Sequence, residues 1–126
     1  LGVTPNDVTY AVFHQPNARF PQVVAKQLGF RNEQIAPGLL AGKIGNTYSA
    51  AAILGLCATL DVANPGDVIL MTSYGSGSGA DAYLIRVGDA VIERRNRAPL
   101  TAKYVTRETM IDYAVYAKWR NKLVMG

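Results

Sequence analysis

Residues 7–17 read Asp-Val-Thr-Tyr-Ala-Val-Phe-His-Gln-Pro-Asn, and this stretch decides the fold class. Its first seven residues are rich in β-branched and aromatic side chains and follow the turn residues Thr4-Pro5-Asn6, so residues 7–13 are predicted to form a buried strand. Asn17 can cap a helix that begins directly after it. His14 therefore lies between a strand end and a helix start, where α/β folds commonly bind ligands.

Three main helices are predicted from the sequence. The first has apolar residues every four positions and ends at Gly29, which suits a left-handed C-cap. Residues 47–63 form a second helix that is almost wholly apolar or small, so it is expected to be buried all round. Thr106 can cap a final helix with one apolar stripe. The apolar positions are Phe20, Val24 and Leu28 in the first helix, and Ile111, Val115, Trp119 and Leu123 in the last.

Further strands make the predicted sheet mixed. Residues 68–71 are a short apolar run of the kind that is buried on both faces, and a glycine-rich turn follows them. Tyr83, Ile85 and Val87 alternate with Leu84 and Arg86, and Gly88-Asp89 can turn the chain into a second strand at residues 90–92. We therefore expect an α/β fold with a mixed β-sheet.

The composition indicates a folded domain that is neither a membrane protein nor a nucleic-acid-binding protein. The chain has 126 residues, of which 49% are apolar and 17% charged, as in ordinary globular proteins. It has no apolar run long enough to span a bilayer and no signal peptide at its start, so we expect it in the cytoplasm. The net charge of +4 comes without a nucleic-acid-binding motif. The basic residues are expected to form a solvated face or to meet the phosphates of a nucleotide-like ligand.

Three segments contain residues that can carry chemistry. His14 can donate or accept a proton near neutral pH, although a lone histidine is also often a hydrogen-bonded structural group. Residues 45–49, Gly-Asn-Thr-Tyr-Ser, offer free N–H groups and an amide to a carbonyl oxygen or an anion, or are simply a helix cap. Residues 73–80, Ser-Tyr-Gly-Ser-Gly-Ser-Gly-Ala, allow close approach of a substrate to the backbone, or are only a turn.

Other readings of these residues are excluded. Residues 75–80 fit a relaxed dinucleotide fingerprint, but a strand rather than a helix is expected next. Neither serine in this turn has the glycines of a hydrolase nucleophile elbow. Cys57 is expected to be buried and inert inside the apolar helix, and as the single cysteine it excludes an internal disulfide. No second histidine or nearby cysteine accompanies His14, so no metal site is predicted.

Taken in order and spacing, the three segments resemble the C-terminal half of thiolase-fold condensing enzymes. The closest likeness is to hydroxymethylglutaryl-CoA synthases of the archaeal type, and the likeness runs along essentially the whole chain. It implies that residues 1–126 are the C-terminal part of a thiolase-like α/β/α layered fold, with residues 100–126 as a C-terminal helical extension. The matching segments are residues 13–17 (Phe-His-Gln-Pro-Asn), 44–49 (Ile-Gly-Asn-Thr-Tyr-Ser), 73–77 (Ser-Tyr-Gly-Ser-Gly) and 113–120.

The resemblance implies condensation of acetyl-CoA with acetoacetyl-CoA to 3-hydroxy-3-methylglutaryl-CoA in the mevalonate pathway, with coenzyme A thioesters as substrates and no further cofactor. His14 would be the acid/base group, Asn46 and Ser76 would bind the substrate, and Arg19 would bind coenzyme A. Val23 stands where some relatives have a basic residue that contacts substrate, so that role is not carried over.

The same resemblance implies what this chain lacks and what it binds. The family's nucleophilic cysteine and its basic glutamate belong to the N-terminal half, so we expect a piece of a larger protein that is inactive alone. The family also implies a homodimer and a complex with acetoacetyl-CoA thiolase through a zinc-containing scaffold protein. Two alternatives stay open: a ketoacyl synthase-type condensing enzyme, and a non-catalytic module that binds acyl-CoA or supports assembly.

Overall fold

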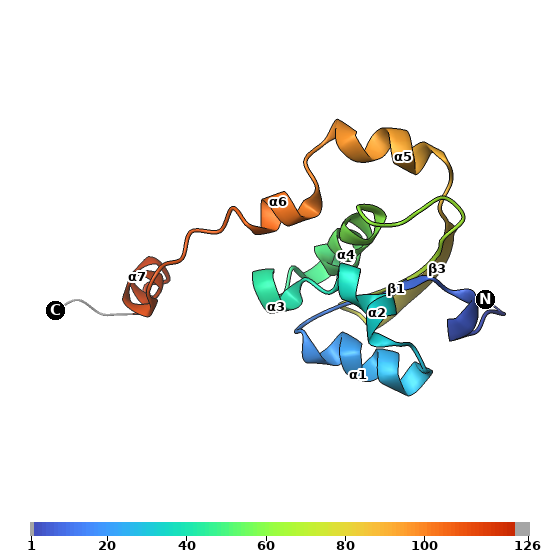
Figure 1. Ribbon diagram of the computed structural model, residues 1–126. Coiled ribbons are helices and arrows are strands. Elements are labelled where there is room, and N and C mark those ends of the chain that lie inside the picture. Colours follow the sequence, from blue (N-terminus) through green and yellow to red (C-terminus); the bar gives the residue numbers. More distant parts are fainter. Residues whose placement is uncertain (1, 123–126) are drawn as a thin grey trace.

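In the computed structural model, which describes residues 2–122, helices lie on both faces of a three-stranded sheet (Figure 1). The strands are β1 (Tyr10–Val12), β2 (Val68–Gly75) and β3 (Gly79–Arg86). The α-helices are α1 (Arg19–Leu28), α2 (Asn32–Ile35), α3 (Ala41–Ile44), α4 (Ala51–Leu60), α5 (Ala90–Arg94), α6 (Thr101–Val105) and α7 (Tyr113–Trp119). Single 3-10 turns are η1 (Pro5–Asp7), η2 (Ala36–Gly38), η3 (Tyr48–Ala50) and η4 (Arg95–Arg97).

The sheet is mixed, as predicted. β1 pairs with β2 in parallel, with Val12 opposite Met71, and β2 pairs with β3 in antiparallel. β1 is shorter than the predicted strand because the chain first makes the turn η1. There the Asp7 carboxylate accepts hydrogen bonds from the main-chain N and the hydroxyl of Thr4, at 2.8 and 2.6 Å, which holds residues 4–7 in a closed turn.

The hairpin is formed by β2 and β3 and turns at residues 76–78. Gly77 and Ser78 have φ of 90° and 62°, which suits a glycine-rich tight turn. The predicted strand at residues 90–92 is wrong, because this segment is α5. Asp89 already has helical dihedral angles, and Val91 packs into the core below α5, so the helix satisfies both the backbone and the apolar side chain.

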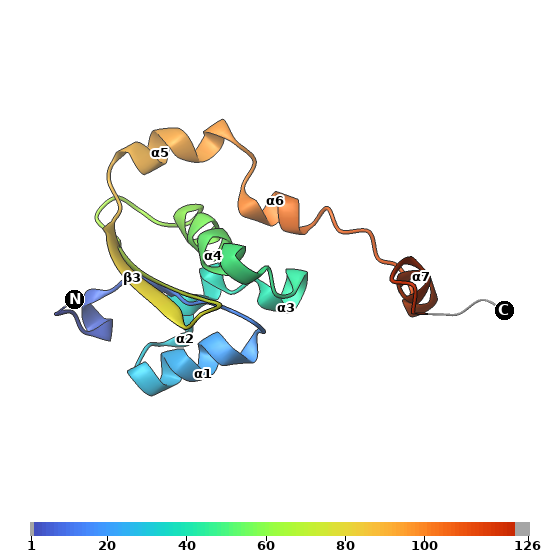
Figure 2. The ribbon, with the colours of Figure 1, turned by 180° about the vertical axis from the view of Figure 1, so that it is seen from behind.

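A separate hydrophobic cluster covers each face of the sheet. Side chains along a strand point alternately to the two faces, so Ala11 and Phe13 join one cluster and Val12 joins the other. The first cluster packs against α1 and α2, and the second against α4. Figure 2 shows the same arrangement from behind, with α1 and α4 on opposite sides of the sheet. β2 contributes to both clusters through Leu70 on one face and Ile69 on the other.

Helix α1 has the predicted ends but a different buried face. Asn17 Oδ1 accepts hydrogen bonds from the main-chain N of Arg19 and Phe20, at 3.0 and 2.9 Å, and Gly29 closes the helix with φ of 86°. The residues buried in α1 are Pro21 and Ala25. Phe20 and Leu28 of the predicted stripe are 61% and 54% exposed, and only Val24 packs against the core cluster, so the buried face is shifted from the predicted one.

Helix α4 lies close to the sheet through small residues. It begins at Ala51 rather than at residue 47, because η3 precedes it, and it ends at Leu60. Gly55 faces Val12 of β1 and Gly38 of η2 closely enough that an added Cβ would lie 2.8 Å from Val12 Cγ1 and 2.9 Å from the Gly38 carbonyl oxygen. Ile53 is 52% exposed, so the expectation of burial all round is wrong: the described residues cover only part of α4.

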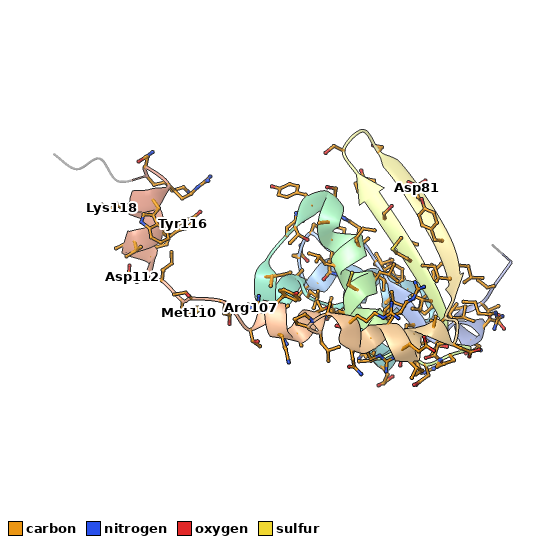
Figure 3. All side chains as sticks on the ribbon, turned by 90° about the horizontal axis from the view of Figure 1, so that it is seen from above. Asp81, Arg107, Met110, Asp112, Tyr116 and Lys118 are labelled. Atoms are coloured by element: carbon orange, nitrogen blue, oxygen red, sulfur yellow. The ribbon has the colours of Figure 1, made fainter. Side chains whose placement is uncertain are left out.

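The last part of the chain runs over the body and then away from it. An extended segment joins α6 to α7, and α7 projects from the rest of the molecule (Figures 1 and 3). Asp112 rather than Thr106 caps this helix, since its Oδ1 accepts from Val115 N at 2.8 Å. Met110 and Trp119 are 84% and 70% exposed. Leu123, predicted on the helix stripe, lies outside the described residues.

None of the helices within residues 2–122 has the length and apolar character needed to cross a membrane.

Candidate active site

His14 leaves the sheet just after the parallel pairing of β1 with β2 ends. β1 and β2 run in the same direction, with Val12 opposite Met71, so the residues that follow each strand pairing meet at one edge of the sheet. Thr72 supports this edge by donating from its hydroxyl to the Val12 carbonyl oxygen, at 3.4 Å. The structure thus places His14 beside the last residues of β2, as expected for a ligand site in an α/β fold.

A cavity of about 530 Å³ opens beside His14. It is walled mainly by apolar side chains of the β1–α1 loop, helix α1 and the end of β2. The lining residues are Phe13, His14, Pro16, Phe20, Val24, Thr72, Ser73 and Tyr74. His14 is half-buried and lines the cavity, so its side chain is accessible to a bound ligand, a placement suited to proton transfer.

Tyr74 is the aromatic partner of His14. The two ring centroids are 6.0 Å apart with a tilt of 55°, within the range of favourable aromatic contacts. Tyr74 is 51% exposed and lies near the end of β2, the strand that pairs with β1, which His14 follows. The pair therefore forms one wall of the cavity and limits the directions from which a ligand can approach the imidazole.

Asn46 acts locally as a turn residue through its oxygen. Oδ1 accepts from Tyr48 N at 2.8 Å, and Tyr48 has a positive φ of 53°, so the amide stabilises the turn before η3. Asn46 is exposed and does not line the cavity beside His14. Both readings of this segment are therefore compatible: the oxygen is used as a cap, and the NH₂ group remains a donor.

Ser76 and Arg19 also lie outside the cavity beside His14. Ser76 is exposed at the turn of the β2–β3 hairpin, two residues beyond Tyr74. Arg19 lines a second cavity of about 710 Å³ on the exposed side of α1, together with Val23 and Gln27. Phe20 and Val24 line both cavities. The cavity beside His14 and the cavity beside Arg19 therefore adjoin each other.

Cys57 is exposed, so the prediction that it is buried in the apolar helix is wrong. It lies on the side of α4 that faces a cavity of about 650 Å³ formed with β3, α5 and α6. This cavity is separate from that of His14, and the thiol is not brought near the imidazole by any contact among residues 2–122.

Sequence patterns alone assign no separate role to Tyr74 or Gln15. Tyr74 was recognised only as part of a glycine-rich turn, because its contact with His14 depends on the parallel pairing of distant strands. Gln15 was recognised only as part of the histidine segment, yet its side chain is 3% exposed and hydrogen-bonded. A polar residue two positions after a predicted buried strand is only a weak signal for such a role.

Comparison with known proteins identifies a matching family model and similar proteins. The family model described as 3-oxoacyl-[acyl-carrier-protein (ACP)] synthase III C terminal matches residues 1–87. The chain is 57% identical to the hydroxymethylglutaryl-CoA synthase of Thermococcus kodakarensis and 53% identical to that of Methanothermobacter thermautotrophicus. Each match covers 99% of this chain and 36% of the relative, so the chain spans about a third of the length of these relatives. The predicted resemblance to the archaeal-type enzymes is confirmed.

Solved structures show the same fold. The curacin biosynthetic pathway HMG synthase, in complex with apo donor-ACP, aligns with a TM-score of 0.74 and 21% identity, covering 94% of this chain and 33% of that chain. At this identity the likeness concerns the fold alone. Together with the mixed sheet and its helical layers, it confirms the prediction of a thiolase-like α/β fold.

Proposed function

Because the chain belongs to the 3-oxoacyl-[acyl-carrier-protein] synthase III C-terminal family, we propose that it is the C-terminal part of a hydroxymethylglutaryl-CoA synthase. The observation that carries the proposal is the identity of 53–58% to synthases of this name along nearly the whole chain. The reaction joins acetyl-CoA, acetoacetyl-CoA and water to 3-hydroxy-3-methylglutaryl-CoA and free coenzyme A, and it belongs to the mevalonate pathway. We propose no cofactor beyond these thioesters.

His14 is the acid/base group in this proposal. The deprotonated methyl carbon of an enzyme-bound acetyl thioester attacks the ketone carbon of acetoacetyl-CoA, and the electron pair of the C=O bond moves to oxygen. His14 then transfers its proton to that oxygen as negative charge develops on it. Its half-buried position at the cavity beside Tyr74 supports this role. The cysteine that holds the acetyl group and the glutamate that deprotonates it come from outside residues 1–126.

Asn46, Ser76 and Arg19 bind the substrates in this proposal. The Asn46 NH₂ group and the Ser76 hydroxyl, both exposed, donate to the acyl portion. Arg19 contacts coenzyme A from the hollow on α1, next to the apolar surface of Phe20 and Val23, and a guanidinium is well suited to phosphate groups. Val23 carries no charge, so in our proposal Arg19 provides the positive charge in this cavity.

The assay is release of coenzyme A from acetyl-CoA and acetoacetyl-CoA by the gene product that contains residues 1–126. We expect His14→Ala to lower kcat by about 10²–10⁴-fold, the usual contribution of an acid/base group. Glu93→Ala, on the exposed face of α5, is the control and should retain full turnover. Residues 1–126 alone should show none. Normal turnover by His14→Ala would refute the assignment.

A ketoacyl synthase is the second candidate, and the description of the matching family supports it. Such an enzyme would condense an acyl thioester with a carrier-protein thioester rather than with acetoacetyl-CoA. Product analysis separates the two, because only the synthase forms the branched hydroxy acid. Turnover with acyl carrier protein and none with acetoacetyl-CoA would favour the second candidate.

We also propose a cytoplasmic homodimer that associates with acetoacetyl-CoA thiolase through a zinc-containing scaffold protein. Support comes only from the resemblance to the archaeal enzymes. Light scattering of the purified gene product tests the dimer, and co-purification of tagged gene product from its own cells tests the complex.

A further inference from the structure

Gln15, the residue after His14, is a polar side chain enclosed by the protein. It is 3% exposed, and its Nε2 donates to the carbonyl oxygens of Gly38 and Ala51, at 2.7 and 3.4 Å. One side chain therefore links the end of β1 to η2 and to the first residue of α4. These hydrogen bonds are expected to persist in the folded protein, because a buried polar group left without a partner lowers its stability.

The oxygen of the same amide holds a third segment. Gln15 Oε1 accepts from the main-chain N of Leu40 and Ala41, at 2.7 and 2.8 Å. An amide has two N–H donors and two acceptor lone pairs, so all four are used. Residues 41 and 51 flank the turn that carries Asn46, so Gln15 forms hydrogen bonds to the main chain at both ends of this turn.

A second glutamine makes similar bonds far from His14. Gln34 is also 3% exposed, and its Nε2 donates to the carbonyl oxygens of Pro5 and Val8, at 2.9 and 2.6 Å. Its Oε1 accepts from Arg31 N at 2.9 Å. Pro5 and Val8 precede β1, so Gln34 acts at the opposite end of the strand from His14. It is a matched control for Gln15.

We propose that Gln15 is a positioning residue, which fixes the His14 loop relative to the turn that carries Asn46. The inference rests on the proposed function, in which both residues act on the same acyl group. Within residues 2–122, no other side-chain hydrogen bond joins these two segments. Catalytic groups must be held within about 0.5 Å of their productive places, and a fully bonded, buried amide provides that restraint.

The first test needs no activity. Gln15→Met and Gln34→Met each replace a buried amide by an unbranched apolar side chain of similar length, and both should lower the midpoint of thermal unfolding. Backbone ¹⁵N relaxation of the gene product that contains residues 1–126 then separates them. Only Gln15→Met should increase the mobility of residues 42–50, including Asn46, which is distant from the substitution in sequence.

The second test measures catalysis in the gene product that contains the chain. A displacement of about 1 Å can cost about 100-fold in rate, so Gln15→Met should lower kcat by about 10–100-fold while KM changes little. Gln34→Met should leave kcat unchanged. In the Gln15→Met background, Asn46→Ala should lower kcat by a smaller factor than in the wild type, because Asn46 is already misplaced.

The two proposals fail in different ways. Absence of synthase activity in the wild type, or full activity of His14→Ala, refutes the proposed function, and the relaxation measurement still decides on Gln15. Equal effects of Gln15→Met and Gln34→Met on residues 42–50 overturn the role of Gln15, whatever the activity. If Gln15→Met does not fold, Gln15→Asn and Gln34→Asn replace the pair, since the shorter amide keeps donors and acceptors but cannot reach all of its partners.

Discussion

Because α4 approaches the sheet closely, Gly55 has less room for an added Cβ than the other glycines of residues 2–122. In Gly55→Ala the new Cβ would lie 2.8 Å from Val12 Cγ1, 2.9 Å from the Gly38 carbonyl oxygen and 3.2 Å from Gln15 Nε2. Overpacking of a core costs about 1–3 kcal/mol, and the upper half of that range applies because a backbone carbonyl cannot rotate away. Alanine regains about 1 kcal/mol of helix propensity. The net loss is about 1–2 kcal/mol.

Gly42→Ala is the matched control for this substitution. Gly42 is also helical, in α3, but there an added Cβ would meet only Ala18 Cβ at 3.5 Å, an ordinary contact. Replacing glycine by alanine at a compatible site stabilises by about 0.4–1 kcal/mol. The two variants should therefore differ by roughly 1.5–3 kcal/mol, although they make the same chemical change.

Urea unfolding of residues 1–126, followed by circular dichroism at 222 nm, measures this difference. We expect the midpoint to fall for Gly55→Ala and to rise slightly for Gly42→Ala, with the same dependence of free energy on urea in both, since neither changes the surface exposed on unfolding. A Gly55→Ala chain as stable as the wild type would refute the reasoning, because α4 would then have room to move away from η2.

Two further predictions concern single side chains. The hydroxyl and then the main-chain N–H of Thr4 lower the pKa of Asp7 below its ordinary value of 3.8. The stabilisation is therefore present above that value and is lost as the pH falls through the lowered pKa of the folded state. Thr4→Val should raise the pKa of Asp7, as followed by NMR titration of its carboxyl carbon, and an unchanged titration would contradict this. The thiol of Cys57 is exposed, so a disulfide reagent should modify the native chain about as fast as the urea-unfolded chain; strong protection would show that α4 is covered.

Features set by local chemistry were predictable from the sequence. The Asn17 cap and the Gly29 C-cap depend on residues three or four positions away, and both are present. The glycine-rich turn between two strands likewise follows from residues that tolerate a positive φ. Such signals are contained within one segment of chain, so the sequence alone is enough to interpret them.

Features that depend on distant segments were not predictable. The apolar repeat of α1 does not say which side meets the sheet, and Phe20 is left exposed. Apolar residues all around α4 indicated burial, yet Cys57 is exposed because the described residues cover only part of the helix. The contact of His14 with Tyr74 requires the parallel register of β1 with β2, which no local pattern encodes. The hydrogen bonds of the Gln15 side chain depend on the positions of three other segments, which no local pattern indicates.

The parallel pairing of β1 with β2 also has a consequence for the order of folding. Thr9 accepts a hydrogen bond from Val68, 59 positions along the chain, whereas the β2–β3 hairpin closes over a short turn. Hairpins form within microseconds, and contacts between distant residues form later because a long loop must first close. The loop between Thr9 and Val68 contains both α1 and α4. The edge of the sheet where His14 lies is therefore expected to form after the β2–β3 hairpin, once this long loop has closed.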